Sequence, residues 1–184
     1  DAALAADLES GQVDLLVILG ANPVYTAPPG LKFAEALAKA RMSVHLGLYD
    51  DETAASCQWH IPEPHPLETW SDARAFDGTA TILQPLIAPL YNNGKSIHEF
   101  VDELLGKSGR KSHDIVREHW AATVTSPTME TSWKRWLNTG VVEGTASRLK
   151  TVTPAMPRDG WKFSSPDLNG LELMFRPDPT VWDG

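Results

Sequence analysis

The stretch Val13-Asp14-Leu15-Leu16-Val17-Ile18-Leu19, followed by Gly20-Ala21-Asn22-Pro23, decides the fold that the sequence predicts. The first part is a nearly continuous apolar run of strand length, which is typical of a parallel strand covered on both faces. The second part is a strong turn signal. We therefore expect a buried strand over residues 13–19 that ends in a sharp turn.

Helices and strands alternate after this strand. Beyond the breaker Pro28-Pro29-Gly30, the spacing predicts a helix over residues 31–41, with Leu31, Ala34 and Ala38 on one face. The next elements are expected to be a strand over 42–48, a short helix over 52–57 and a strand over 59–61. This order predicts an α/β fold: a Rossmann-like parallel sheet with flanking helices, in which the first two strands are neighbours.

The second half is predicted to be mainly helical and to end in an irregular tail. Ser96 and Glu99 have the spacing of a capping box, so a helix should begin after Ser96. The remaining expected elements are helices over 4–10, 97–105, 112–123 and 130–137, a strand over 79–83 and a strand-like piece at Leu171–Phe175. We expect an α/β domain over residues 1–144 and an irregular, Pro-rich extension over 145–184.

Composition excludes several classes of function. The formal net charge of −8 disfavours nucleic acid, because binding to a duplex depends on Lys and Arg. A single cysteine, Cys57, excludes an internal disulfide and a self-contained iron–sulfur cluster. The apolar runs are shorter than the roughly 18 residues of a membrane span, so no direct insertion is expected. Without an initiator Met or a signal peptide, the chain looks like a fragment whose compartment cannot be deduced from its own start.

Three groups of residues are candidates for chemistry. Asn22, with Thr26 behind it, stands where a parallel sheet binds ligands, although an Asn-Pro pair also simply makes turns. There is no G-x-G-x-x-G motif, so a standard dinucleotide site is not supported. The second group consists of Cys57, His60 and His65, with Glu63 and Glu68 nearby. These are residue types that bind zinc or iron, but their spacing matches no standard metal site, so we expect no metal there.

The third group is His65, Glu68 and Asp72, which is compatible with an acid–base pair in a small hydrolase. No nucleophile stands beside it, so we favour an ordered polar loop anchored by Trp70. Glu68 and Asp72 should then accept hydrogen bonds from nearby backbone groups or from His65. No catalytic residue is therefore assigned.

Aromatic residues gather in the helical part of the chain. Trp133 and Trp136 are three residues apart and can face one side of a helix. They are expected to pack in the core, and an exposed pair would instead indicate a docking surface. His113 and His119 are expected at the surface.

Residues 16–106 resemble an α/β domain of the dimethyl sulfoxide reductase superfamily of molybdopterin oxidoreductases. The matching pieces, in the family's order, are Leu19-Gly20-Ala21-Asn22-Pro23, Phe33-x-Glu35-Ala36-Leu37, Glu52-Thr53-Ala54, Ile61-Pro62, Leu67-Glu68, Gly78 and Pro85. In that family the domain helps to hold the guanosine-diphosphate end of molybdopterin guanine dinucleotide. The resemblance implies that Gly20, Asn22 and Thr53 line or adjoin the nucleotide crevice.

The chain departs from the usual family pattern in two places, and both point to one branch of the superfamily. The family usually has an Asp before its Leu-Pro element, where this chain has Cys57-Gln58-Trp59-His60-Ile61-Pro62. The segment from His60 to Asp72, and Trp133-x-x-x-Leu137-x-x-Gly140-Val141-Val142, look instead like the molybdopterin-oxidoreductase-like iron–sulfur subunit of alternative complex III. That resemblance implies a bacterial, periplasmic or membrane-associated respiratory complex in which this region keeps no molybdenum cofactor.

The sequence therefore favours a fragment of such a subunit, acting as a scaffold without its own redox centre. Its expected partners are the rest of the parent polypeptide and other subunits, and the iron–sulfur clusters would belong to the parent. The alternative is a genuine cofactor-binding domain of an active molybdenum oxidoreductase.

Overall fold

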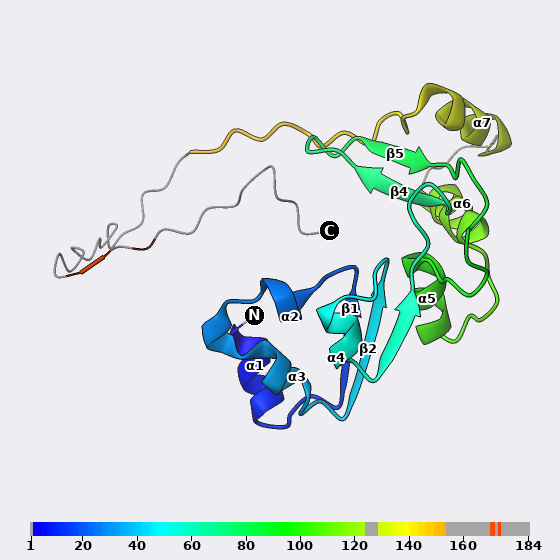
Figure 1. Cartoon of the computed structure of the whole chain (residues 1–184). Coiled ribbons are helices and arrows are strands. Elements are labelled where there is room, and N and C mark those ends of the chain that lie inside the picture. The colour runs from blue at the N-terminus through cyan, green and yellow to red at the C-terminus, as the bar shows by residue number, and fades with distance from the viewer. Residues whose placement is uncertain (1, 124–128, 154–169, 172, 174–184) are drawn as a thin grey trace. The chain divides into compact units, whose positions relative to one another are not determined.

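The computed structural model describes residues 2–123, 129–153, 170, 171 and 173 (Figure 1). The chain divides into two units, Asp1–Ser147 and Arg148–Gly184. The first unit extends beyond Gly144, because the Thr145 hydroxyl accepts a hydrogen bond from the Ala80 amide and the Ser147 amide donates one to Asp77. The strand-like piece expected at 171–175 falls on residues that lie outside those described, apart from Leu171 and Leu173.

The first unit holds all the described helices and strands. Its first half contains α1 (Ala2–Glu9), β1 (Leu15–Leu19), α2 (Pro23–Thr26), the 3-10 helix η1 (Pro29–Leu31), α3 (Phe33–Leu37), β2 (Met42–Gly47), α4 (Glu52–Ser56) and β3 (Trp59–Pro62). Its second half contains β4 (Ser71–Arg74), β5 (Ala80–Leu83), α5 (Ile97–Leu104), α6 (Ser112–Thr123) and α7 (Met129–Thr139).

A three-stranded parallel sheet in the order β1-β2-β3 confirms the predicted α/β fold. Val17 of β1 pairs with Val44 of β2, which in turn pairs with Trp59 of β3. The helices α1 and α3 pack on one face of this sheet, where Leu8, Ile18 and Leu37 form part of a buried cluster. The predicted parallel pairing of the first two strands is thus confirmed.

The predicted helix over 31–41 is wrong in its length and in its buried face. Lys32 has a left-handed backbone with a φ of 46°, so η1 ends there and α3 begins at Phe33. Ala34 and Ala38 are exposed. The helix face that packs in the core is shifted by two residues from the predicted one and consists of Phe33, Ala36, Leu37 and Ala40.

A second layer is built around an antiparallel pair, β4 and β5, with α6 and α7 beside it (Figure 1). Its core joins Ile82 of β5 to Val116 of α6 and to three buried tryptophans, Trp120, Trp133 and Trp136. The tryptophan pair of α7 is therefore core, as expected. The sequence predicted only β5, because Ser71–Arg74 is polar and gives no strand pattern.

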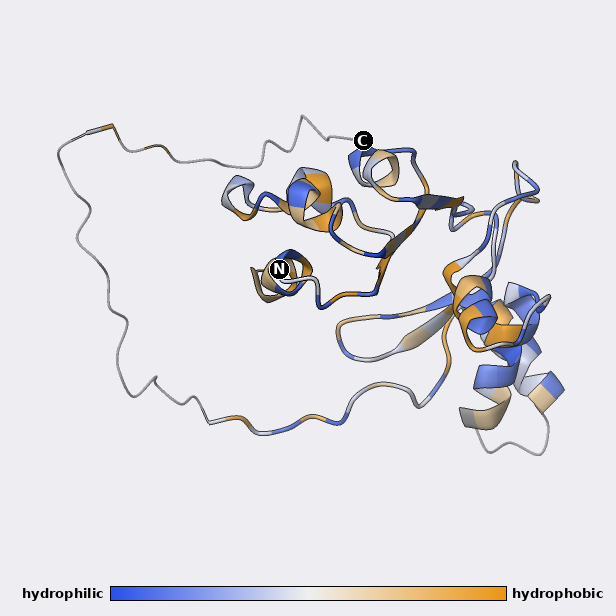
Figure 2. Ribbon diagram, turned by 90° about the horizontal axis from the view of Figure 1, so that it is seen from below, coloured by the Kyte–Doolittle hydropathy of each residue, from blue (hydrophilic) through white to orange (hydrophobic). Residues whose placement is uncertain are grey.

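The other predicted helices agree with the structure to within two residues at each end, whereas α2 and η1 were expected to be turn and breaker segments. Ser96 and Glu99 form the predicted capping box at the start of α5, with both reciprocal hydrogen bonds present. Figure 2 shows apolar residues both in the parallel strands and in the helices beside them. Among the described residues, no helix has the length and apolar character needed to cross a membrane.

Candidate functional site

The loops that follow β1 and β2 bring Gly20, Asn22 and Thr53 to the carboxyl edge of the parallel sheet. Gly20 has a φ of 59°, a left-handed conformation that favours glycine, and its amide donates to Leu46 O at 2.8 Å. This bond extends the ladder between β1 and β2 by one residue, and the positive φ of Gly20 turns the chain immediately after β1. The residues that the resemblance implies for a nucleotide crevice are therefore neighbours in space, at the edge where such sheets bind ligands.

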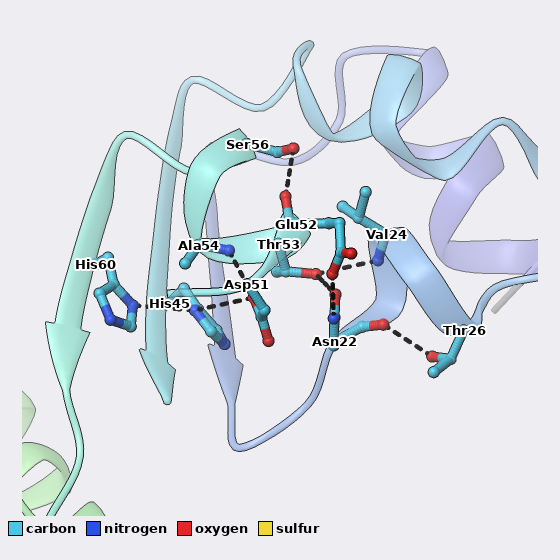
Figure 3. A network of polar contacts seen from close by, with 10 residues as sticks. All are labelled: Asn22, Val24, Thr26, His45, Asp51, Glu52, Thr53, Ala54, Ser56 and His60. Atoms are coloured by element: carbon cyan, nitrogen blue, oxygen red, sulfur yellow. Dashed lines mark hydrogen bonds and ion pairs between the residues drawn. The ribbon is translucent and has the colours of Figure 1, made fainter. Parts of the chain in front are cut away.

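Asn22 and Thr53 are held together by a dense set of hydrogen bonds, which we call the Asn22 network (Figure 3). The Thr53 hydroxyl donates to Asn22 Oδ1 at 2.7 Å and accepts from the Val24 amide at 3.0 Å. Asn22 Nδ2 donates to Glu52 Oε2 at 2.7 Å. Thr53 is fully buried. The network thus ties the loop after β1 to the start of α4.

The Asn22 network uses the donors that a phosphate would need. In Rossmann-like folds a phosphate binds free backbone N–H groups at the start of the helix after the first strand. Here that helix begins with Pro23, which has no N–H, and the next amide, of Val24, is bonded to Thr53. At the start of α4, Asp51 Oδ1 accepts from the Ala54 amide at 2.9 Å. At each of the two helix starts, one amide is therefore bonded to a side chain of the protein itself.

Carboxylates stand where an anionic ligand would lie. The hydrogen bond from Asn22 lowers the pKa of the Glu52 carboxyl below its ordinary value, so this group is charged at neutral pH. Asp51 is next to it, at the N-cap of α4. A diphosphate placed at these loops would meet negative charge, so the groups present do not fit the guanosine-diphosphate end of a molybdopterin cofactor.

A pair of histidines lies beside the network, on β2 and β3. His45 Nδ1 and His60 Nδ1 are 3.1 Å apart, and the rings are stacked with centroids at 5.1 Å (Figure 3). Burial lowers the pKa of His45, and the nearby Asp51 carboxylate opposes this shift. A Cβ on Gly47 would lie 2.6 Å from Cε1 of His45, so the ring fits only because residue 47 is a glycine. Sequence reasoning missed His45, since a histidine inside an apolar strand gives no motif.

A cavity of about 910 Å³ opens at the carboxyl ends of β2 and β3. Its walls combine apolar and aromatic side chains with the acidic groups Asp50, Glu63 and Glu68 and with His60 and His65. Burial raises the pKa of Glu63, since desolvation disfavours its charged form. Among the described lining residues there is no lysine or arginine. The cavity therefore offers apolar contact and hydrogen-bond acceptors but no cation for a phosphate.

Four of the candidate metal ligands, His60, Glu63, His65 and Glu68, line the cavity, but they do not converge on one point. Cys57 packs against the core cluster under α3, and burial raises the pKa of its thiol. His60 faces His45, whereas His65 is exposed and its Nδ1 accepts from the Leu67 amide at 3.1 Å. Among the described residues, no group of three His, Cys, Asp or Glu side chains has a geometry that fits a metal.

The polar loop after β3 is ordered by hydrogen bonds, as expected for Glu68. This side chain is buried, and its Oε2 accepts from the His65 amide at 3.3 Å. The expectation for Asp72 is wrong about the donor: its Oδ2 accepts from the indole N–H of Trp120 at 2.9 Å, because β4 packs against α6. Of the three residues in the hydrolase hypothesis, His65 and Glu68 therefore bond within the loop, and Asp72 bonds to α6.

The histidines of α6 differ from each other. His113 was expected at the surface but is half-buried, with its ring edge against Trp70 and Trp133 at centroid distances of 4.8 and 5.9 Å. His119 is exposed, as expected, and its ring meets Trp120 edge-on. The second layer thus uses His113 as part of its aromatic packing.

Comparison with known proteins agrees with the broad resemblance. The chain is 33% identical over 98 residues to the "menaquinone reductase, molybdopterin-binding-like subunit" of Nitratidesulfovibrio vulgaris, strain Hildenborough. The match covers 51% of this chain and 14% of that protein, so the chain spans a small part of its relative's length. No model of a known protein family matches the chain. The similarity therefore supports a molybdopterin-oxidoreductase-like relationship at the level of the broad family.

Proposed function

We propose that this chain is a scaffold domain of a molybdopterin-oxidoreductase-like subunit in a respiratory electron-transfer complex, and that it holds no redox centre of its own. The observation that carries the proposal is the Asn22 network. The resemblance assigns Asn22 and Thr53 to a nucleotide crevice. In the structure their side chains form hydrogen bonds to Glu52, to the Val24 amide and to each other. Their role in this proposal is to join two loops.

Electrostatics supports the same proposal. The chain has a formal net charge of −8, and carboxylates stand both at the start of α4 and in the cavity at the ends of β2 and β3. Binding a diphosphate next to Glu52 would require either its protonation or an added cation. A scaffold needs neither.

The similarity to the menaquinone reductase subunit supports the respiratory setting. In this proposal the partners are the remainder of a longer polypeptide and other subunits of a membrane-associated complex, and the location is bacterial and periplasmic or membrane-associated. The iron–sulfur clusters and any molybdopterin belong to other parts of the assembly.

The second candidate is a genuine molybdopterin-guanine-dinucleotide-binding domain. The position of Gly20, Asn22 and Thr53 at the carboxyl edge of the parallel sheet favours it, because this is where α/β sheets bind ligands. In this case the ligand would have to displace Glu52 from Asn22.

Two measurements on the purified chain separate the candidates. We expect metal analysis to find no stoichiometric molybdenum, iron or zinc, and titration calorimetry with GDP to show no saturable heat. A metal-to-protein ratio near one would overturn the scaffold proposal. GDP binding that is lost in Asn22→Ala and kept in Thr26→Val would favour the cofactor-binding candidate, because Thr26 ends α2 and its hydroxyl donates to the Asn22 backbone oxygen, not to the Asn22 side chain.

A further inference from the structure

One face of the parallel sheet is built from apolar side chains alone. Paired residues of a parallel ladder point to the same face, and residues along a strand alternate. Leu15 pairs with Met42, and Val44 pairs with Trp59. The face that contains them, which we call the apolar face, consists of Leu15, Val17, Leu19, Met42, Val44, Leu46, Trp59 and Ile61.

The helices lie on the opposite face. Leu16 and Ile18 point to that side and pack in the cluster formed with α1 and α3, and Cys57 at the end of α4 joins the same cluster. Figure 2 shows these helices on one side of the sheet. None of the side chains of the apolar face belongs to either core cluster of the described residues.

Water reaches the apolar face at the amino ends of its strands. Leu15 is 50% exposed, Met42 46% and Trp59 62%, and these three residues run across the amino ends of the strands. Leu46, farther along β2, is fully buried. Parallel strands are normally covered on both faces, and a contiguous exposed apolar patch indicates an interaction site.

Topology explains why the described crossover helices of this sheet all lie opposite the apolar face, and what would cover that face. The strands β1, β2 and β3 lie side by side in chain order, and right-handed crossovers that advance in one direction place every helix on the same face. Helices reach the second face of a doubly wound sheet when strands are added in the opposite direction, here beyond β1. Within the described part of the chain, β1 has no strand on that side.

We propose that the apolar face binds amphipathic α-helices from outside residues 1–184, in the longer polypeptide that the proposed function implies, with a further strand beside β1. This inference rests on the proposed scaffold function and identifies the surface through which the scaffold would bind the rest of the polypeptide. A face without a single polar side chain matches the apolar stripe of such a helix and would leave a polar or charged partner without hydrogen bonds. The related subunit is long enough to supply these helices, since the match covers 14% of it.

Photo-crosslinking in the whole assembled subunit tests the proposal. Met42 is replaced by p-benzoylphenylalanine, and the control carries the same replacement at Glu35, whose side chain is 72% exposed on α3. After irradiation, mass spectrometry identifies the crosslinked peptides. We expect the Met42 position to crosslink to a helical segment outside residues 1–184 and the Glu35 position not to reach that segment. Crosslinks to a second copy, to residues 148–184 or to no protein at all would overturn the proposal.

Charge substitutions provide a second readout. Met42→Lys with Trp59→Lys should leave the circular dichroism of the isolated chain unchanged, because both side chains are about half exposed. In the whole subunit the double variant should lower the yield of assembled complex several-fold, whereas Glu35→Lys should not. Normal assembly of the double variant would contradict the inference. Nucleotide binding by the chain would overturn the proposed scaffold function, but it would not change the crosslinks expected from Met42, so the two proposals can fail separately.

Discussion

Removing the Thr53 hydroxyl tests whether the Asn22 network is the structural joint that we infer. Thr53→Val keeps the size and shape of the side chain and deletes its oxygen. The variant loses the bond to Asn22 Oδ1 and leaves the half-buried Val24 amide without its acceptor. Because Thr53 is fully buried, water cannot simply replace the missing partner.

The expected loss of stability follows from these contacts. A hydrogen bond contributes about 0.5–1.5 kcal/mol net, so the loss of two bonds costs about 1–3 kcal/mol of unfolding free energy. In a domain of roughly 150–250 residues, 1 kcal/mol corresponds to a shift of about 2–4 °C in Tm. A loss near the middle of the range should therefore lower Tm by about 4–8 °C.

Urea and thermal unfolding, followed by tryptophan fluorescence and circular dichroism, measure the effect. Thr26→Val is the matched control, because its hydroxyl is exposed and bonds to Asn22 O, and it should change stability by less than about 0.5 kcal/mol. If Thr53→Val were as stable as the control, the hydroxyl would not support the joint, and the main argument for a scaffold role would fail.

Three further predictions concern other parts of the domain. Gly47→Ala should lower the free energy of unfolding by about 1–3 kcal/mol in urea titrations, because its Cβ would contact the ring of His45 too closely. The control, Gly30→Ala, has open space around the new methyl group and should be neutral. Equal stabilities of the two variants would contradict the close approach of Gly47 to His45. Asp72→Ala should cost about 1–3 kcal/mol in the same assay, because it leaves the buried indole N–H of Trp120 unpaired, and a neutral result would mean that this bond is dispensable. Because the pKa of His45 is lowered on folding, the unfolded chain binds more protons below about pH 6.5, so stability should fall as the pH drops from neutral through that range. His45→Gln should flatten this dependence in thermal scans at pH 5–7.5, and an unchanged slope would contradict the assignment.

The fold was predictable where hydrophobic pattern and turn chemistry agree. The apolar run that ends at Gly20 gave the first strand, and the capping box at Ser96 gave the start of α5. Helix α3 shows the limit of this reasoning. Periodicity alone could not reveal that Lys32 adopts a left-handed backbone, which delays the helix and rotates its buried face toward Phe33.

The missed features depend on contacts between segments distant in sequence. The strand β4 is polar and exists because Trp120 of α6 bonds to its Asp72 and because β5 pairs with it. The histidine pair is likewise visible only once β2 and β3 are placed in register, since His45 and His60 are partners across the ladder. No local pattern carries this information.

Asn22 illustrates why a family motif predicts a fold more firmly than a ligand. An amide at the carboxyl edge of a parallel sheet can donate to a phosphate, and the resemblance assigns it that role. The same amide can bridge two adjacent loops, and here it donates to Glu52 and accepts from Thr53. What distinguishes the two roles is the neighbouring charge: a carboxylate bonded to Asn22 repels a phosphate but stabilises a joint. Replacing the acid is therefore the decisive change. If Glu52→Gln allowed GDP to bind where the unmodified chain does not, the crevice would be a nucleotide site closed by a single carboxylate; if it did not, the joint itself would be what these residues provide.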